Sequence, residues 1–171
     1  MSLRVGIAGY GLAGRYFHAP LLKGCGFEVA AVLTTNPVRS EHARQDFPAT
    51  AVVESMQELV GHNLDLVVVA SANLVHAEQA AVALKAGIPV VVDKPMGRNY
   101  EETTAIVELS KTLGVPVSTF FNRRWDSDAL TIKKVIASGV LGDIHRMDSR
   151  FERFRPDVNQ DSWRENMSAE D

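Results

Sequence analysis

The sequence predicts an α/β fold in which helices cover both faces of a parallel sheet. The first observation is a series of short, continuously apolar runs, and the second is that helix-forming stretches separate them. A strand that is buried on both faces needs no polar alternation, and these runs show almost none. The expected strands are residues 3–8, 29–33, the short 51–53, 66–70, 90–92 and 115–121.

Two helices between these strands should begin at capping residues. Ser55 is followed three positions later by Glu58, which is the spacing of a capping box. Asn99 precedes Glu102 in the same way. We expect the second of these helices to end before Gly114, because a glycine readily takes the left-handed conformation that closes a helix.

Two further helices are expected, one between the fourth and fifth strands and the other between the first and second. One runs over 75–85 and stops at Gly87. The other follows Gly11 and reaches Pro20, which should end or kink it because proline has no N–H to donate.

The pattern changes after residue 121. A helix capped by Asp126 or Asp128 is expected through residue 138, and the polar–apolar segment 144–154 should be an exposed edge strand. A charge-rich loop follows. The sequence therefore predicts two domains, a complete α/β domain over 1–121 and the beginning of an incomplete α/β domain over 122–171.

The composition excludes several classes of protein. The 171 residues carry a net charge of −3, which lacks the basic footprint of a nucleic-acid-binding protein. The single cysteine, Cys25, excludes a disulfide framework, and no His, Cys or carboxylate spacing suggests a metal site. No apolar run approaches the 18 or so residues of a membrane span, and the N-terminus does not resemble a signal peptide. We expect a soluble cytoplasmic protein.

A glycine motif of the form G-x-G-x-x-G directly follows the first expected strand and opens a helix, which is the context that gives it meaning. The first glycine permits a tight turn, the second lets the backbone approach a pyrophosphate, and the third lets the helix pack on the strand. The helix N-terminus offers free N–H groups to the anion. A Rossmann doubly wound sheet with a dinucleotide site is predicted; the alternative is a glycine-rich loop without a ligand. The motif residues are Gly9, Tyr10, Gly11, Leu12, Ala13 and Gly14.

The residues after the second strand favour NADP over NAD as cofactor. An acidic residue at this place would bind the ribose 2′-OH of NAD, but no carboxylate lies between residues 28 and 41. Hydroxyl and amide groups followed by Arg39 suit a 2′-phosphate better. The alternative is a turn over 35–37 with a solvated Arg39. The positions that could contact the ribose are Thr34, Thr35 and Asn36.

Several further stretches accompany the glycine motif in a specific order and spacing: 70–73 with His76, 86–90, 93–95, 122–125 and 139–144. Together with 9–14 they resemble the Gfo/Idh/MocA family, that is, glucose–fructose oxidoreductase and inositol dehydrogenase. Asp93 stands where the family usually has glutamate. The family also continues past residue 171 into an Asp-Leu-Gly-x-His type motif that helps bind substrate and often supplies the acid/base. The resemblance therefore implies a truncated product that binds cofactor with little turnover.

Lys94 is the expected catalytic residue. It follows the fifth strand at its carboxyl end, where open α/β sheets bind ligands. An ammonium there can stabilise the charge that grows on a carbonyl oxygen during hydride transfer, or donate the proton. Judged from the residues alone, Asp93 and Lys94 are a charged strand end before a turn-forming proline. The resemblance implies a place beside nicotinamide and substrate, and a cis Lys94–Pro95 bond.

Other polar residues at strand ends are expected to contact the cofactor. For Ser71 and Asn73 the alternative is that they cap the helix over 75–85, and for His76 it is a structural role. For Arg123 and Arg124 the alternative is an interdomain salt-bridge cluster. Trp163 and Arg164 resemble a family stretch beside the substrate pocket. The expected cofactor-binding residues at these strand ends are Ser71, Ala72, Asn73, His76, Asp93, Lys94, Pro95, Asn122 and Arg124.

The resemblance implies an NAD(P)-dependent oxidoreductase that transfers hydride between nicotinamide and a sugar- or polyol-type hydroxyl or carbonyl compound. It also implies that the full-length parent is a homo-oligomer. The alternative is a non-catalytic NAD(P)-sensing regulatory protein on the same fold. Lys94 favours the enzyme, because a sensor has no chemical need for it.

Overall fold

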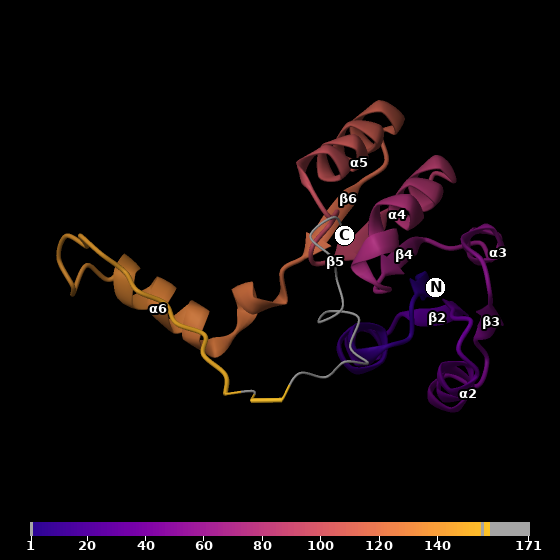
Figure 1. Cartoon of the computed structure of the whole chain (residues 1–171), viewed down its shortest axis with the longest axis horizontal. Helices are drawn as coiled ribbons and strands as arrows, with labels where there is room; N and C mark the ends of the chain where they lie inside the picture. Colours follow the sequence, from indigo (N-terminus) through magenta and orange to yellow (C-terminus); the bar gives the residue numbers. More distant parts are fainter. Residues whose placement is uncertain (1, 155, 158–171) are drawn as a thin grey trace. The chain divides into compact units, whose positions relative to one another are not determined.

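The structure is a computed structural model that describes residues 2–154, 156 and 157. Six parallel strands form one sheet in the order β3-β2-β1-β4-β5-β6 (Figure 1). The chain order reverses between β1 and β4, so this is the doubly wound sheet expected from the sequence, and all six expected strands are confirmed. Their bounds are β1 Arg4–Ala8, β2 Glu28–Leu33, β3 Ala51–Val53, β4 Leu66–Val69, β5 Val90–Asp93 and β6 Val117–Phe120.

Helices connect the strands, and side-chain caps begin three of them. Asn36, Ser55 and Asn99 each accept a hydrogen bond from the backbone N–H three residues later. The caps at Ser55 and Asn99 were expected, whereas the helix that Asn36 begins was not. The helices are η1 Gly14–His18, α1 Ala19–Gly24, α2 Pro37–Asp46, α3 Met56–Val60, η2 Asn73–Val75, α4 His76–Lys85, α5 Tyr100–Leu113, η3 Asn122–Trp125 and α6 Ser127–Ala137.

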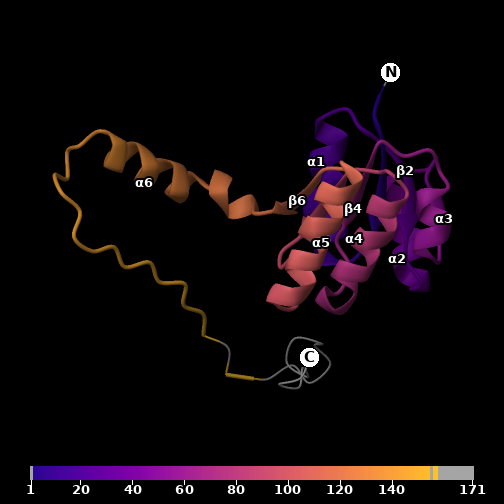
Figure 2. The ribbon, with the colours of Figure 1, turned by 90° about the horizontal axis from the view of Figure 1, so that it is seen from above.

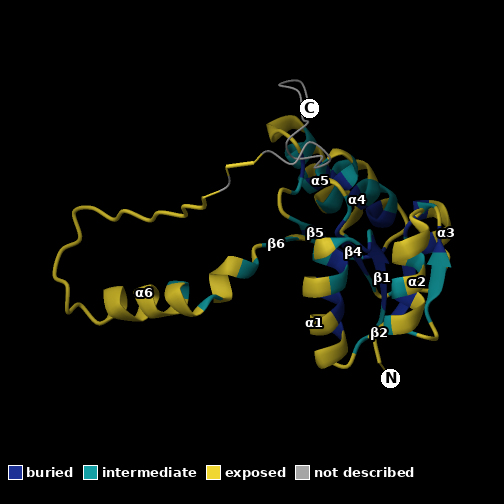
Figure 3. Cartoon of the chain, turned by 60° about the horizontal axis from the view of Figure 1, so that its bottom comes forward, coloured by how far each residue is buried: buried dark blue, intermediate teal, exposed yellow. Residues whose placement is uncertain are grey.

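Two apolar cores lie on opposite faces of the sheet. Leu59 of α3, Leu84 of α4 and Ile106 of α5 belong to one cluster of buried side chains. Leu22 of α1 and Ala43 of α2 belong to the other. Figure 2 shows α4 and α5 side by side, and Figure 3 shows the buried strands between the helices. Burial on both faces explains why the strands read as continuous apolar runs.

The first helix does not end at Pro20, which corrects that half of the expectation. The chain is helical from residue 12 to residue 24, and η1 is wound as a π-helix just before the proline. Pro20 then lies in the first turn of α1. Proline has no N–H to donate, and this costs little at such a position, because the π-helix before it already departs from the regular α-helical hydrogen-bond pattern.

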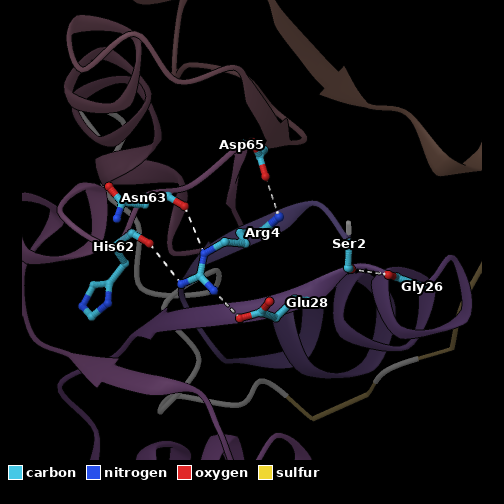
Figure 4. A network of polar contacts seen from close by, with 7 residues as sticks. All are labelled: Ser2, Arg4, Gly26, Glu28, His62, Asn63 and Asp65. Carbon is cyan, nitrogen blue, oxygen red and sulfur yellow. Dashed lines mark hydrogen bonds and ion pairs between the residues drawn. The ribbon is translucent and has the colours of Figure 1, made fainter.

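Arg4 and its partners hold the amino ends of neighbouring strands together, at the end of the sheet opposite the glycine turn (Figure 4). The Arg4 guanidinium pairs with Glu28 and donates to the carbonyls of His62, at 3.2 Å, and Asn63, at 3.1 Å. The Arg4 N–H donates to Asp65 Oδ2 at 2.8 Å. One residue thus links β1, β2 and the loop that enters β4.

The chain divides into two compact units, residues 1–120 and residues 121–171. In the second unit the expected helix is confirmed as α6, with Asp126 at its N-cap position but without the expected side-chain cap. Segment 144–154 contains no strand in the part of the chain that the structure describes. A strand needs a partner for its N–H and C=O groups, and no strand of the described part pairs with this segment. The expected loop toward residue 171, with Trp163 and Arg164, lies outside the described residues.

Two kinds of feature are missing from the described part of the chain. No helix there is long and apolar enough to cross a membrane. Three or more potential metal ligands do not come together there.

Candidate dinucleotide-binding site

The glycine turn connects the end of β1 to the first helix. Gly9 has a φ of +95°, and a Cβ added to it would come within 2.6 Å of the Ser71 backbone. A Cβ at Gly14 would lie 2.0 Å from the Gly9 carbonyl oxygen. These two positions therefore require glycine for backbone conformation and close packing.

Gly11 differs from the other two glycines, because the space beside it is open. A Cβ added there would meet only the Arg39 guanidinium, at 3.7 Å. Open space above the middle glycine is what the approach of a pyrophosphate requires. The turn therefore fits the phosphate-binding role that the sequence predicts.

The side chains within the motif differ in how far they are exposed. Tyr10 is 1% exposed, and its hydroxyl donates to Asp46 Oδ2 at 3.0 Å. Burial and the Asp46 carboxylate raise the pKa of Tyr10, and the Arg15 guanidinium, 2.8 Å away, lowers the pKa of Asp46. Tyr10 can therefore offer only its backbone to a ligand, whereas Leu12 is exposed and Ala13 half-buried.

The end of β2 brings Arg39 beside the glycine turn. Thr34 is buried and its Oγ1 accepts from the Asn36 N–H at 3.3 Å, while Thr35 is exposed. The Asn36 side chain accepts from the Arg39 N–H at 3.1 Å and so caps α2. The turn over 35–37 that was the alternative is not observed, because Pro37 already begins α2, and the exposed Arg39 side chain lies beside Gly11.

These residues surround a hollow of about 390 Å³. Its cationic members are Arg15 and Arg39, His42 also lines it, and the described residues that line it include no carboxylate. His42 was not singled out from the sequence, because α2 itself was not expected. We call this cavity the Arg39 hollow. Its lining residues are Tyr10, Gly11, Leu12, Arg15, Tyr16, Asn36, Val38, Arg39 and His42.

The segment after β4 approaches the glycine turn at Ser71. The Ser71 hydroxyl donates to Gln79 Oε1 at 2.6 Å. Neither Ser71 nor Asn73 provides a side-chain cap for α4, so the capping alternative is not observed. Ala72 instead begins η2 with extended backbone.

The segment after β5 carries the residues expected to do chemistry. The Lys94–Pro95 peptide bond is cis, as the resemblance implied. The Asp93 carboxylate accepts from the Lys94 N–H at 2.9 Å, and the Lys94 side chain is exposed. His76 is 1% exposed and lies between this segment and Ser71. The structure thus brings Ser71, His76 and residues 93–95 together.

His18 is a buried group that the sequence analysis did not select. It is 4% exposed, its ring centroid lies 4.3 Å from that of Phe120, and Nε2 has no partner among the described residues. Burial lowers the pKa of His18, and the nearby negative charge of Asp93 opposes this. A lone histidine on a helix gives no sequence signal for such surroundings.

Asn122 and Arg124 belong to the second unit, in η3. The Arg124 guanidinium lies 5.0 Å from the centre of the Phe121 ring. Its neighbour Arg123 pairs with Asp126 at 2.8 Å. The ion pair between Arg123 and Asp126 lies within this unit and is not the interdomain cluster of the alternative. A cofactor role for Asn122 and Arg124 stays a prediction.

Comparison with known proteins gives relatives in sequence and structure. The chain is 42% identical to the uncharacterized oxidoreductase YdgJ of Escherichia coli, over 96% of this chain and 47% of that protein. It is 38% identical to scyllo-inositol 2-dehydrogenase (NADP(+)) IolW of Bacillus subtilis, over 96% of this chain and 45% of that one. The structure of the oxidoreductase yvaA from Bacillus subtilis is similar with a TM-score of 0.88 and 36% identity, covering 94% of this chain and 46% of that one.

The chain spans about half the length of the curated relatives it matches. The family model described as "Oxidoreductase family, NAD-binding Rossmann fold" matches residues 3–121. The glycine turn, the strand order and this match agree, and the chain belongs to the Gfo/Idh/MocA oxidoreductase family.

Proposed function

We propose that the chain binds NADP(H), with the 2′-phosphate in the Arg39 hollow. The observation that carries this is the position of the Arg39 guanidinium over Gly11, in a hollow whose described lining contains no carboxylate. A fork of N–H donors suits a phosphate, and a carboxylate would repel one. The relative IolW is named as NADP-dependent, which supports the same preference.

The pyrophosphate would lie over Gly11, at the N-terminus of the first helix, where free backbone N–H groups meet it. Ser71 and residues 93–95 would face the nicotinamide half, because they follow β4 and β5 at the carboxyl edge of the sheet. When bound, the nicotinamide supplies or accepts a hydride.

Lys94 would handle the proton of the reaction. In oxidation its amine takes the proton of the substrate hydroxyl, while the carbon that bears this hydroxyl gives its hydride to the nicotinamide. In reduction its ammonium donates that proton to the forming alkoxide and stabilises the negative charge. Its exposed position at the end of β5 leaves the amine free to reach a substrate.

We propose a polyol as the substrate class, because the named relative acts on scyllo-inositol. We further propose that the protein works in the cytoplasm as a homo-oligomer. The single free cysteine is consistent with a reducing compartment.

Calorimetric titration with NADPH and NADH at matched salt tests the cofactor proposal. Tighter binding of NADPH is expected. Tighter binding of NADH would overturn the assignment of the Arg39 hollow, and failure of a folded chain to bind either nucleotide would overturn the whole proposal.

A second assay uses the full-length parent that contains this chain, follows NADP⁺ reduction with scyllo-inositol, and compares that protein with its Lys94→Ala variant. Polyol-dependent NADPH formation should disappear in the variant, while its affinity for 2′-phospho-ADP-ribose stays unchanged. Full turnover by the variant would refute the role of Lys94.

A further inference from the structure

His76 connects two segments at the carboxyl edge of the sheet. It is the first residue of α4, and its ring is 1% exposed. Nδ1 lies 2.7 Å from the carbonyl oxygen of Pro95, and Nε2 lies 3.2 Å from that of Ser71. Both ring nitrogens thus face backbone carbonyls, and a direct contact of His76 with the cofactor stays a prediction.

Both ring nitrogens face carbonyl oxygens, which only accept, and a neutral ring carries one proton for the two of them. We assign that proton to Nδ1, because its contact with the Pro95 carbonyl is the shorter one. Proline has no N–H, and its carbonyl is therefore the single backbone group through which a hydrogen bond can hold residue 95. His76 is the partner of that carbonyl.

The turn that carries Lys94 is thus held at two points. On one side the Lys94 N–H donates to the Asp93 carboxylate at 2.9 Å, and on the other the Pro95 carbonyl is held by His76. The exposed Lys94 side chain takes its position from this backbone, because a long amine in solvent is not fixed by packing.

Helix α4 holds the neighbouring segment as well. Gln79, one turn after His76, accepts from the Ser71 hydroxyl at 2.6 Å. The start of α4 therefore sets the positions of the segments after β4 and β5 together, and these are the two segments proposed to face the nicotinamide.

We propose that His76 is a positioning residue for Lys94, acting through its Nδ1 hydrogen bond to the Pro95 carbonyl. The proposal rests on the function proposed for Lys94. It assigns His76 no contact with substrate or cofactor, and it predicts that the donor at Nδ1, not the imidazole as such, is what the site requires.

Two near-isosteric variants separate the two ring nitrogens. The amide nitrogen of an asparagine comes close to the place of Nδ1, and that of a glutamine comes close to the place of Nε2. We expect His76→Asn to keep the bond to Pro95 and His76→Gln to lose it. Urea denaturation of both variants shows whether they fold with equal stability.

Binding of NADPH and of 2′-phospho-ADP-ribose is then measured for the protein and both variants. His76→Gln should lower the affinity for NADPH by roughly three- to tenfold, the range expected for one net hydrogen bond. His76→Asn should have the affinity of the unaltered protein. Affinity for 2′-phospho-ADP-ribose, which lacks nicotinamide, should stay the same in all three. Equal NADPH affinities, or equal losses for both nucleotides, would overturn the proposal.

A ligand-free measurement keeps this test separate from the proposed function. In ¹H–¹⁵N spectra, the amide signals of Lys94 and Met96 should move in His76→Gln and stay in place in His76→Asn. Unmoved signals in both variants would overturn the positioning role whatever the cofactor result. If the unaltered protein binds no nicotinamide nucleotide, the proposed function fails, and these spectra still decide whether His76 holds the turn.

Discussion

The Arg39→Ala substitution gives the sharpest test of how the cofactor is recognised. Arg39 lies over Gly11, and the described lining of the Arg39 hollow has no carboxylate to repel a phosphate. Hydrogen bonds to charged groups contribute about 1.5–3 kcal/mol. At about 1.4 kcal/mol for each factor of ten, losing the guanidinium should weaken NADPH by roughly 10- to 150-fold.

NADH lacks the 2′-phosphate, so its affinity should change little in the same variant. Both nucleotides are titrated calorimetrically at two salt concentrations, because screening reduces the contribution of an exposed cation. The fold is expected to persist, since the backbone N–H of residue 39, not its side chain, bonds to Asn36.

Arg44→Ala is the matched control. It removes the same charge from the same helix, but Arg44 does not line the hollow. Equal losses of NADPH affinity in the two variants would mean that only the net charge matters. Equal losses of NADPH and NADH in Arg39→Ala would place the guanidinium at another part of the cofactor, and either result would refute the reasoning.

Three further predictions concern the first unit. Gly14→Ala should abolish nucleotide binding or destabilise the fold, because the added Cβ would meet the Gly9 carbonyl. Gly24→Ala is the control and should bind nucleotide normally, because a Cβ at Gly24 has no atom within 4 Å. Calorimetry and urea denaturation compare the two variants. Tyr10→Phe should cost about 1 kcal/mol of unfolding free energy through the lost bond to Asp46, and an unchanged urea midpoint would contradict this. The lowered pKa of His18 means that the unfolded chain binds a proton more readily, so stability is complete above about pH 6.5 and falls below it. Urea midpoints at successive pH values should show this loss, and a His18→Gln variant with the same pH slope would exclude His18 as its source.

The strands and two helix starts were predictable because their signals are local. Continuous apolar runs define strands buried on both faces, and the caps at Ser55 and Asn99 act within three residues. The glycine turn was predictable for the same reason. Its three glycines, the strand before them and the helix after them lie within one short stretch of chain.

The features that escaped prediction depend on distant contacts. Helix α2 buries only Ala43, so it shows no apolar stripe to betray it. The bond from His76 to Pro95 joins segments that are separated along the chain. Segment 144–154 has the alternation of a strand, but pairing also needs a neighbour, which local pattern does not reveal.

The central place of β1 has a consequence for synthesis on the ribosome. β1 is synthesised before β2 and β4, yet both of its edges are paired in the finished sheet, one with β2 and the other with β4. Its β4 edge therefore stays open while roughly 60 further residues are translated, which takes several seconds at ordinary elongation rates. Unpaired strand edges make folding intermediates prone to aggregation, so slow codons between β2 and β4 should increase aggregation of the nascent chain.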